Sequence, residues 1–488
     1  MSNRRSFKSD TSFLEKISIG AIGTKQVFAS MVNQGHRPIE LERGSMSFKI
    51  WKQIKIKRIR VPDILCVNCS TRIESRAKTS FEISMSHSVS DPDRAWDNGL
   101  KDEDYVAFPV CSRSGPAPIA WKADKLVQFT SIEDLRSAQR RGNVVVTEAK
   151  GAQEGFEKRI VWPTAASKAS GVIAEVTKTR LQYRRNSDGR LITLRLSKGK
   201  KALRPLLKTG DSIVQNQVLA SVVDVKTEIP CSKSASDIFY IDALSSKTLS
   251  ERYAASKALS YFPSKRAFNS LALKVNDPEE HVYVRLEAAA SLARHSMSDG
   301  WRFIEERLSD DFLQNRLEAV IILGEIDDKQ SVESLSRVLD GVDQHPEIRA
   351  GAAWALGELK NKAALGVLIK SFNAVEQDVR IEAARALSKL AQEYSLEVVS
   401  EFPKSRENER AGLAWALTKA GKITLDDVLK LLVDEDARRW AAYIVGMQEP
   451  GKYLDAIERL KAKDPELYFA VTVLWKIISS WTYNLEEY

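Results

Sequence analysis

The sequence contains few of the residues on which histidine- and cysteine-based chemistry depends. In 488 residues there are five histidines and four cysteines, Cys66, Cys69, Cys111 and Cys231. So few scattered thiols exclude a disulfide framework and make a reducing cytoplasm the expected compartment. No run of eighteen apolar residues occurs, so we expect no membrane-spanning helix. Glycine-rich phosphate loops, metalloprotease motifs and a Ser-His-Asp order are also missing, which disfavours those enzyme classes.

Charge is distributed unevenly along the chain. Residues 1–245 hold 41 Lys and Arg against 26 Asp and Glu, whereas residues 246–488 hold 33 against 39. A basic first half favours nucleic acid, DNA before RNA, as its partner. Adjacent domains that merely differ in charge are the alternative. Residues 1–12 are polar and basic, which predicts a disordered arm and no secretory signal.

The second half carries an internal repeat. An arginine followed by small apolar residues recurs in stretches such as VRLEAAASLAR, IRAGAAWALGEL and VRIEAARALSKL. The arginines that mark the copies lie 30 to 33 residues apart: Arg252, Arg285, Arg316, Arg349, Arg380 and Arg410. A period near thirty predicts stacked helix pairs in a solenoid. The copies resemble HEAT repeats of the short type found in phycobilin-lyase-like proteins, over about residues 245–450.

The array is slightly acidic, so we expect it to bind a protein partner rather than nucleic acid. The repeated arginines are expected to be structural, each binding a carboxylate or carbonyl near a helix start. Trp354, Trp415 and Trp440 are expected to pack inside the array, with exposed docking anchors as the alternative. A lyase-like or protein-binding array with an unrelated basic head is a further hypothesis for the whole chain.

The first hundred residues alternate between helix-like and strand-like patterns. Residues 13–36 predict a helix that ends at Gly35. Residues 37–42 predict a strand, and residues 48–67 predict a long basic strand with a bulge. Residues 72–86 predict a returning strand, because the stretch VNCST between the two turns the chain.

Two acidic residues lie on opposite strands of this expected hairpin. Asp63 follows a proline at the start of an apolar segment, and Glu74 precedes Arg76 and Lys78 at strand spacing. A hairpin would bring the two carboxylates together beside these cations. Paired carboxylates suit Mg²⁺ or Mn²⁺, which activate water against a phosphodiester. A charged, solvent-facing strand pair is the alternative.

The order of helix, strand, basic strand ending in Pro-Asp and strand with Glu-x-Arg-x-Lys resembles the PD-(D/E)XK nuclease superfamily. The arrangement is that of Holliday-junction resolvases and Mrr-like restriction enzymes. The matching stretches are IGAIGTKQVF, IELERGS, RVPD and IESRAK. The resemblance implies that Asp63 and Glu74 are metal ligands and that Gln26 stands where a first-helix glutamate is common. It also implies a helix and a further strand within residues 96–110.

One residue departs from the superfamily's pattern. Its lysine, two residues after the glutamate, is Arg76 here, and an arginine stays protonated and cannot act as a base. Lys78, on the same face, is the candidate substitute; otherwise the domain binds DNA without cutting it. Basic residues before the Pro-Asp pair are expected to form a phosphate track, with a solvated edge strand as the alternative. They are Lys55, Lys57, Arg58 and Arg60.

The thiols form one short motif, because Cys66 and Cys69 make a single C-x-x-C at the expected hairpin tip. A structural zinc ion normally takes four protein ligands. Cys111 and His87 are possible further ligands for such an ion, but they form no second paired motif. A structural zinc is therefore not expected.

Residues 113–245 are β-rich and basic. The stretch SDG at 187–189 predicts a hairpin turn, and LLKTGDSIVQNQVLASVVD resembles the barrel-sandwich motif of lipoyl-type modules without a carrier lysine. Eleven basic residues and one acid lie between residues 178 and 208. This density predicts a nucleic-acid clamp in which Tyr183 would stack on a base; acidic protein partners are the alternative. The candidate contacts are Arg180, Arg184, Arg185, Lys200 and Lys201.

These patterns predict a multidomain α+β chain with four parts. They are a disordered arm (1–12), a restriction-endonuclease-like α/β domain (13–112), a basic β-rich domain (113–245) and an α-solenoid of HEAT-like repeats (246–488). The leading hypothesis is a Mg²⁺-dependent endonuclease, by analogy in restriction, phage defence or DNA repair, whose array recruits a protein partner. The alternative is a non-catalytic DNA-binding scaffold.

Overall fold

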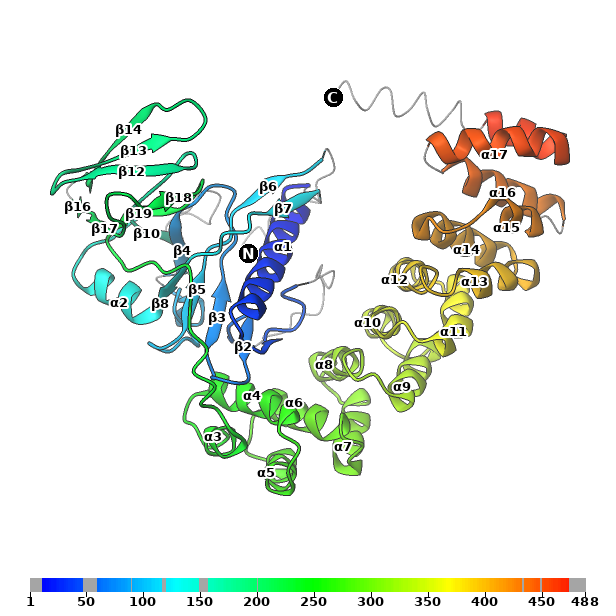
Figure 1. Cartoon of the computed structure of the whole chain (residues 1–488). Helices are drawn as coiled ribbons and strands as arrows, with labels where there is room; N and C mark the ends of the chain where they lie inside the picture. Colours follow the sequence, from blue (N-terminus) through cyan, green and yellow to red (C-terminus); the bar gives the residue numbers. More distant parts are fainter. Residues whose placement is uncertain are drawn as a thin grey trace, which may run out of the picture. The chain divides into compact units, whose positions relative to one another are not determined.

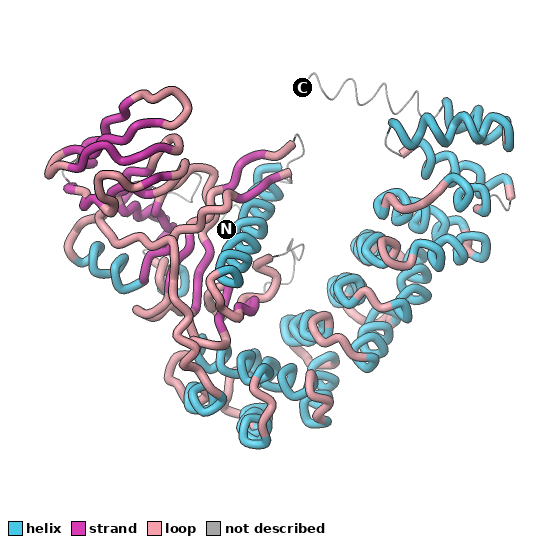
Figure 2. Tube along the Cα trace, viewed as in Figure 1, coloured by secondary structure: helices cyan, strands magenta, loops and turns pink. Residues whose placement is uncertain are grey.

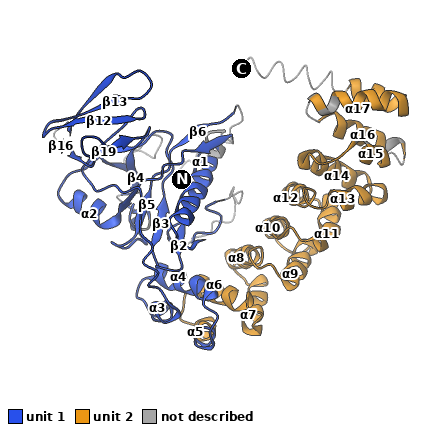
Figure 3. Cartoon of the chain, in the orientation of Figure 1, with its two compact units in different colours: residues 1–50, 57–270 blue, residues 51–56, 271–488 orange. Residues whose placement is uncertain are grey.

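The computed structural model describes residues 11–46, 59–88, 90–115, 120–148, 157–199, 201–431, 434–447 and 450–473. The chain forms two compact units, unit 1 up to residue 270 and unit 2 from residue 271 onward (Figure 3). Strands concentrate in unit 1, whereas unit 2 is helical (Figure 2), which confirms a multidomain α+β chain. Residues 1–10 of the predicted arm lie outside the described residues, and so do Lys55, Lys57, Arg58 and Lys200.

Unit 1 is organised around a five-stranded sheet in the order β1-β2-β3-β5-β8. Its strands are β1 Pro38–Glu40, β2 Ile64–Cys66, β3 Arg72–Ser75, β5 Tyr105–Ala107 and β8 Phe129–Ser131. β3 and β5 run parallel, and the other neighbouring pairs are antiparallel. β2 and β3 form the predicted hairpin, with Ile64 opposite Ile73.

The helix predicted over 13–36 is confirmed as α1 (Thr11–Asn33), which packs along this sheet (Figure 1). Gly23 permits a close approach, because a Cβ there would lie 2.5 Å from the Ala77 Cβ. Val27 is buried in the core between helix and sheet. Gly35 adopts φ +81° just after the helix, the left-handed conformation that glycine tolerates best.

Two local predictions are wrong. The strand predicted over 72–86 is split, because β3 ends at Ser75 and β4 (Ile83–Ser88) joins another sheet in the order β4-β10-β9. Its partners there are β10 (Glu157–Trp162) and β9 (Val145–Glu148). The helix expected within 96–110 is replaced by turns, where Gly99 takes φ +76°. The strand expected there is β5.

The segments on both sides of residue 113 share one core. The rings of Trp96 and Trp162 pack edge to face, with centroids 5.1 Å apart. The indole Nε1 of Trp162 donates to the Leu135 carbonyl of α2 (Ile132–Arg140) at 3.0 Å. The boundary expected near residue 113 therefore lies inside a packed unit, because β4 and β10 pair across it.

The rest of the basic segment forms two small sheets around a core of its own, in the orders β14-β13-β12-β18 and β11-β19-β17. The strands are β11 Thr164–Ala166, β12 Gly171–Val176, β13 Arg180–Arg185, β14 Leu191–Arg195, β17 Arg204–Pro205, β18 Ser212–Ile213 and β19 Val218–Ser221. Two short hairpins pair β6 Cys111–Arg113 with β7 Trp121–Ala123 and β15 Ser197–Lys198 with β16 Lys201–Ala202. The predicted turn between β13 and β14 is confirmed, with Gly189 at φ +69°.

The first helices of the predicted array belong to unit 1. They are α3 (Asp237–Ala243) and α4 (Leu249–Ala258). Arg72 Nη1 donates to Ser250 Oγ at 3.1 Å, and Arg43 Nη1 donates to Tyr253 Oη at 2.8 Å. The repeat copy at residue 251 therefore packs against the sheet of unit 1.

Unit 2 is a two-layer stack of helix pairs. Helix α5 (Lys265–Asn276) precedes the first pair in the chain. The first helices are α6 Val282–Ala293, α8 Leu313–Leu323, α10 Pro346–Leu359, α12 Gln377–Leu390, α14 Glu407–Ala420 and α16 Glu435–Gly446. The second helices are α7 Ser298–Leu308, α9 Lys329–Asp340, α11 Leu365–Lys370, α13 Ser395–Glu401, α15 Leu425–Lys430 and α17 Pro450–Lys463. Successive first helices pack on one another in one layer (Figure 1), and small residues let them approach. A Cβ on Gly357 would lie 2.7 Å from the Ala386 Cα.

The structural role predicted for the repeated arginines is confirmed. Each of the five repeated arginines that lie in unit 2 donates to a backbone carbonyl at or just beyond the end of the preceding helix, where carbonyls lack intrahelical partners. The pairs are Arg285 with Val275 O, Arg316 with Asp310 O, Arg349 with Leu339 O, Arg380 with Ala374 O and Arg410 with Phe402 O. Arg349 and Arg410 also bind carboxylates of the next repeat, Glu376 and Asp434.

Candidate functional site

The β2–β3 hairpin assembles a carboxylate cluster, defined here as Glu42, Asp63 and Glu74. Because Ile64 pairs with Ile73, Asp63 lies opposite Glu74. Asp63 Oδ2 accepts a hydrogen bond from the Ser75 N–H at 2.7 Å. The backbone N–H of Glu42 donates to the Asp63 carbonyl at 3.3 Å, which brings the third acid alongside.

Electrostatics in this cluster favour a cation. Burial raises the pKa of Asp63 well above its ordinary value, and the nearby charges of Glu74 and Glu42 raise it further. Arg76 opposes this effect: its Nη2 lies 2.7 Å from Glu74 Oε1, and its charge lowers the pKa of Asp63. Oxygen donors of this kind match the ligand preference of Mg²⁺ and Mn²⁺.

Lys78 follows Arg76 by two residues and lies just after the end of β3. Its Nζ donates to the Ser84 carbonyl at 2.8 Å and to Ser84 Oγ at 3.1 Å. Burial lowers the pKa of this amine to about 8, and the nearby Arg76 and Arg159 add to the effect. Lys78 is thus closer to neutrality at physiological pH than an exposed lysine, as a proton acceptor needs to be.

Arg76 and Lys78 also line a basic pocket of about 280 Å³. Its other side chains are polar, cationic or thioether groups of β4, β10 and the adjoining loops. They are Arg60, Ser84, Met85, Ser86, His87, Ser88, Arg94 and Arg159. Carboxylates are missing from this lining, so the pocket suits an anion such as a phosphate.

Other predicted site residues do not join this site. The Gln26 amide donates to the Lys125 carbonyl at 3.3 Å. The β module is the part of unit 1 from β11 to β19, with its two small sheets and their core. In it, Arg180 pairs with Glu175 at 3.1 Å, Arg185 pairs with Asp188, and Lys201 donates to the Gly142 carbonyl. Arg184 donates to the Gly189 carbonyl at 3.0 Å. A nucleic-acid clamp by these residues stays a prediction.

The stacking role predicted for Tyr183 is wrong. Its ring is 1% exposed in the core of the β module. The hydroxyl accepts a hydrogen bond from the Lys168 N–H at 3.2 Å. Alternation along β13 explains the difference, because Leu181 and Tyr183 face inward while Arg180 and Arg184 face outward.

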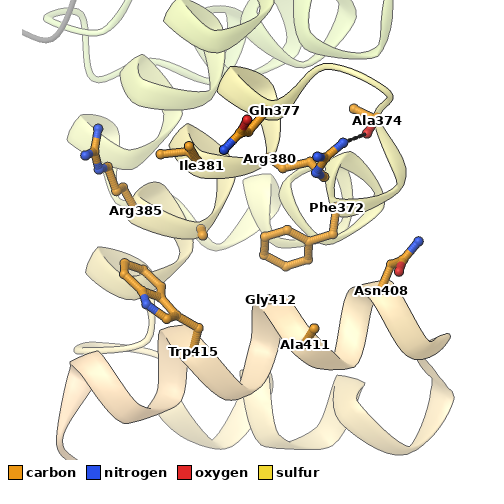
Figure 4. Close-up of a pocket in the computed structure, with 11 residues that line it drawn as sticks. Phe372, Ala374, Gln377, Arg380, Ile381, Arg385, Asn408, Ala411, Gly412 and Trp415 are labelled. Atoms are coloured by element: carbon orange, nitrogen blue, oxygen red, sulfur yellow. Dashed lines mark hydrogen bonds between the residues drawn. The ribbon is translucent and has the colours of Figure 1, made fainter. Parts of the chain in front are cut away.

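Unit 2 carries a docking groove of about 640 Å³ between α12 and α14 (Figure 4). Phe372, Ile381 and Trp415 supply its apolar surface, and polar groups surround them: Gln377, Arg380, Arg385 and Asn408. Gly412 keeps the groove open, because a Cβ there would lie 2.4 Å from atoms of the Phe372 ring. None of the groove's lining residues is acidic. The sequence singled out Trp415 and Arg380 but did not predict that they line a groove.

A third group of side chains, the thiol cluster, consists of His36, Cys66, Cys69 and Cys231. One possible ligand atom from each lies within 4.8 Å of all the others. Of the additions weighed from the sequence, His87 lies in the basic pocket and Cys111 Sγ contacts the Ile19 carbonyl. His36 and Cys231 were missed, because neither lies near the C-x-x-C in the sequence.

Comparison with known proteins identifies the repeats. Residues 302–388 match the family model of HEAT repeats. No curated protein matches the chain. Among the described helices, none has the length and apolar character that crossing a bilayer requires.

Several solved structures are similar to about half of the chain. The CpcE–CpcF complex of the phycocyanin lyase of Nostoc sp. PCC7120 shares 18% identity over 50% of this chain and 94% of its own, with a TM-score of 0.26. Human deoxyhypusine hydroxylase shares 16% identity over 43% and 96%, with a TM-score of 0.21. Computationally designed armadillo repeat proteins for modular peptide recognition share 16% over 43% and 98%, with a TM-score of 0.21. Likenesses this distant carry no conclusion about activity or partners.

Proposed function

We propose that the HEAT array is a docking module that binds an extended, acidic segment of a partner protein across α12 and α14. The docking groove is the observation that carries this proposal. Stacked helix pairs present a continuous surface of first helices, and repeat proteins use such surfaces for binding. The match to HEAT repeats supports the same conclusion.

The groove's chemistry specifies the segment. Phe372, Ile381 and Trp415 offer an apolar surface for a large side chain, of the kind on which binding energy concentrates. Arg380 adds positive charge at the groove, and Arg385 lies there as well, in an ion pair with Glu382 of its own helix. We therefore expect a segment with an aromatic or long aliphatic residue flanked by carboxylates.

Selection of linear peptides from a random display library on the full-length protein tests this proposal. Peptides selected by the wild type should bind at least about tenfold more weakly to Trp415→Ala and Gly412→Ala. Gly366→Ala is the matched control, because a Cβ at that helical glycine meets nothing within 4 Å. Equal affinity for all variants, or selected peptides without acidic residues, would contradict the proposal.

A second candidate function rests on the carboxylate cluster beside the basic pocket. We propose that Asp63 and Glu74 hold Mg²⁺ or Mn²⁺ and that unit 1 cleaves a phosphodiester bond in nucleic acid. The buried Asp63 carboxylate, whose pKa is raised by burial and by its acidic neighbours, fits a cation ligand. The bound ion would supply an activated water and neutralise phosphate charge.

The chain's own cations have separate roles in this proposal. Arg76 stays protonated, holds Glu74 in place and faces the pocket, where it would bind the phosphate. Lys78, with its pKa of about 8, would accept a proton from the attacking water. The order of β1, β2, β3 and β5 supports the resemblance to PD-(D/E)XK nucleases.

Cleavage of plasmid, linear and branched DNA with Mg²⁺ or Mn²⁺ tests this second function. Asp63→Asn and Glu74→Gln should each lower cleavage about 100-fold or more, since the ion supplies several kcal/mol. Glu175→Gln, at an exposed ion pair of the β module, is the control. Calorimetric titration with Mn²⁺ separates ion binding from activity. Wild-type protein that neither binds Mn²⁺ nor cuts DNA would contradict the proposal.

A further inference from the structure

The thiol cluster joins three segments that are far apart in the sequence. His36 follows α1, Cys66 ends β2, Cys69 lies in the turn before β3, and Cys231 lies in the segment between β19 and α3. His36, Cys66 and Cys69 are buried, and Cys231 is partly buried. All four belong to unit 1. Two segments therefore supply three buried donors, and a third segment adds Cys231, which is not the pattern of a chance surface grouping.

Two distances within the cluster match those of a tetrahedral metal site, and every other pair of ligand atoms lies within 4.8 Å. The sulfurs of Cys66 and Cys231 lie 3.9 Å apart, and Cys69 Sγ lies 3.4 Å from His36 Nδ1. A tetrahedral zinc with bonds of about 2.3 Å to sulfur and about 2.0 Å to nitrogen separates two sulfurs by about 3.8 Å. It separates sulfur from nitrogen by about 3.5 Å. A disulfide would instead need the sulfurs about 2.05 Å apart.

Neighbouring groups already orient the ligands. His36 Nε2 lies 2.8 Å from the Ile229 carbonyl, so the other nitrogen, Nδ1, faces the thiols as an acceptor. Such a bond from the second ring nitrogen to a carbonyl is the usual support of a metal-bound histidine. Without this bond to a carbonyl, the imidazole could carry its proton on either ring nitrogen.

The turn of the C-x-x-C is fixed by backbone bonds. The Cys66 N–H donates to the Thr71 carbonyl at 2.8 Å. Ser70 takes φ +59°, and its N–H donates to the Cys66 carbonyl at 2.9 Å, which closes the tight turn. The turn keeps the two sulfurs within 4.8 Å of each other, so that one ion can bind both.

We propose that His36, Cys66, Cys69 and Cys231 bind one structural zinc ion. Three sulfurs and one imidazole nitrogen are a common ligand set for zinc. All four positions are filled by protein, so the site has no open position for a catalytic water. The ion ties the end of α1 and the β2–β3 hairpin to the segment that leads into α3.

Contacts around the site show what the ion would stabilise. The Ile229 N–H donates to Gln34 Oε1 at 2.7 Å, and the Ala235 N–H donates to the Asn68 carbonyl at 3.0 Å. Tyr240 of α3 donates to the Val67 carbonyl at 3.0 Å. These bonds hold the irregular segment from 226 to 236 against the sheet. The zinc would anchor that segment at its middle.

Metal analysis of the full-length protein, purified without a metal-binding tag, tests the proposal. We expect one zinc ion per chain, and replacement by Co²⁺ should give the visible absorption of a tetrahedral thiolate site. Cys231→Ser should lower metal affinity at least about tenfold, because loss of a partner that merely supports a ligand already costs that much. Cys111→Ser, at a buried thiol outside the cluster, should retain the full zinc content.

A conservative variant keeps the test decisive if Cys231→Ser fails to fold. His36→Cys should still bind one Co²⁺ ion, and the thiolate-to-cobalt absorption should increase because a fourth sulfur joins the metal. An unchanged cobalt spectrum would overturn the assignment of His36. Wild-type protein that binds neither zinc nor tetrahedral Co²⁺, or equal loss of metal in Cys111→Ser and Cys231→Ser, would overturn the proposal.

Discussion

Replacing Arg349 with alanine tests how the repeats are held together. The Arg349 side chain is 8% exposed and its Nη1 lies 2.9 Å from Glu376 Oε2. Its Nε donates to the Leu339 carbonyl at 3.0 Å. The substitution leaves a buried carbonyl without its donor, which costs about 1–3 kcal/mol. It also removes a partly buried ion pair, so we expect a total loss of about 3 kcal/mol in the free energy of unfolding of unit 2.

Urea denaturation of the full chain, followed by helical circular dichroism, measures the total loss. Hydrogen exchange locates it, because amides of α9 and α10 should exchange about 100-fold faster for a 3 kcal/mol loss. Arg302→Ala is the matched control: that side chain is 61% exposed and pairs with Asp299 on its own helix. It should cost less than about 1 kcal/mol. A loss below about 1 kcal/mol in Arg349→Ala, or equal losses in both variants, would refute this account of the repeated arginines.

Three further predictions concern stability and are checked by denaturation of the full chain. Arg72→Met should cost about 3–5 kcal/mol, because it leaves the 3%-exposed carboxylate of Asp104 without its partner; adding Asp104→Leu should restore most of the loss. Gly366→Ala should stabilise by about 0.5–1 kcal/mol, whereas Gly357→Ala should destabilise, since its Cβ would lie 2.7 Å from the backbone of the next first helix. Burial lowers the pKa of Lys78 from 10.5 to about 8. The unfolded chain therefore binds more protons between these pH values, and wild-type stability should rise by at most about 3 kcal/mol from pH 8 to pH 10.5. Lys78→Met should lack this rise, and the same rise in both proteins would contradict it.

Much of the fold was predictable wherever the determining contacts are local or periodic. The helix predicted over 13–36 ends at Asn33, just before the positive φ of Gly35, and the hairpin that brings Asp63 opposite Glu74 turns within VNCST. The arginine period predicted the stacked helix pairs of unit 2, because the arginine of each repeat binds a carbonyl near the end of the preceding helix. These features depend on residues within a few turns or one repeat of one another.

Contacts between distant segments were not predictable in the same way. Alternation over 72–86 indicated one strand, yet β4 pairs with β10, more than seventy residues later, and leaves the first sheet. Cys231 follows Cys69 by more than 160 residues, so no spacing rule connects it to the C-x-x-C. The docking groove depends on Gly412 meeting the Phe372 ring of the preceding repeat. Each of these features appears only when the packing of separate elements is known.

The repeated arginines bond only to neighbouring repeats, and this affects how the number of repeats can change during evolution. Each arginine binds the carbonyls of the helix just before it, and Arg349 and Arg410 reach no further than the next repeat. A recombination event that adds or removes one whole repeat would therefore change these arginine bonds only at the new junction. A backbone carbonyl is present at the end of any preceding helix whatever its sequence, so the carbonyl bond can form again there, and a longer or shorter array would present more or less surface.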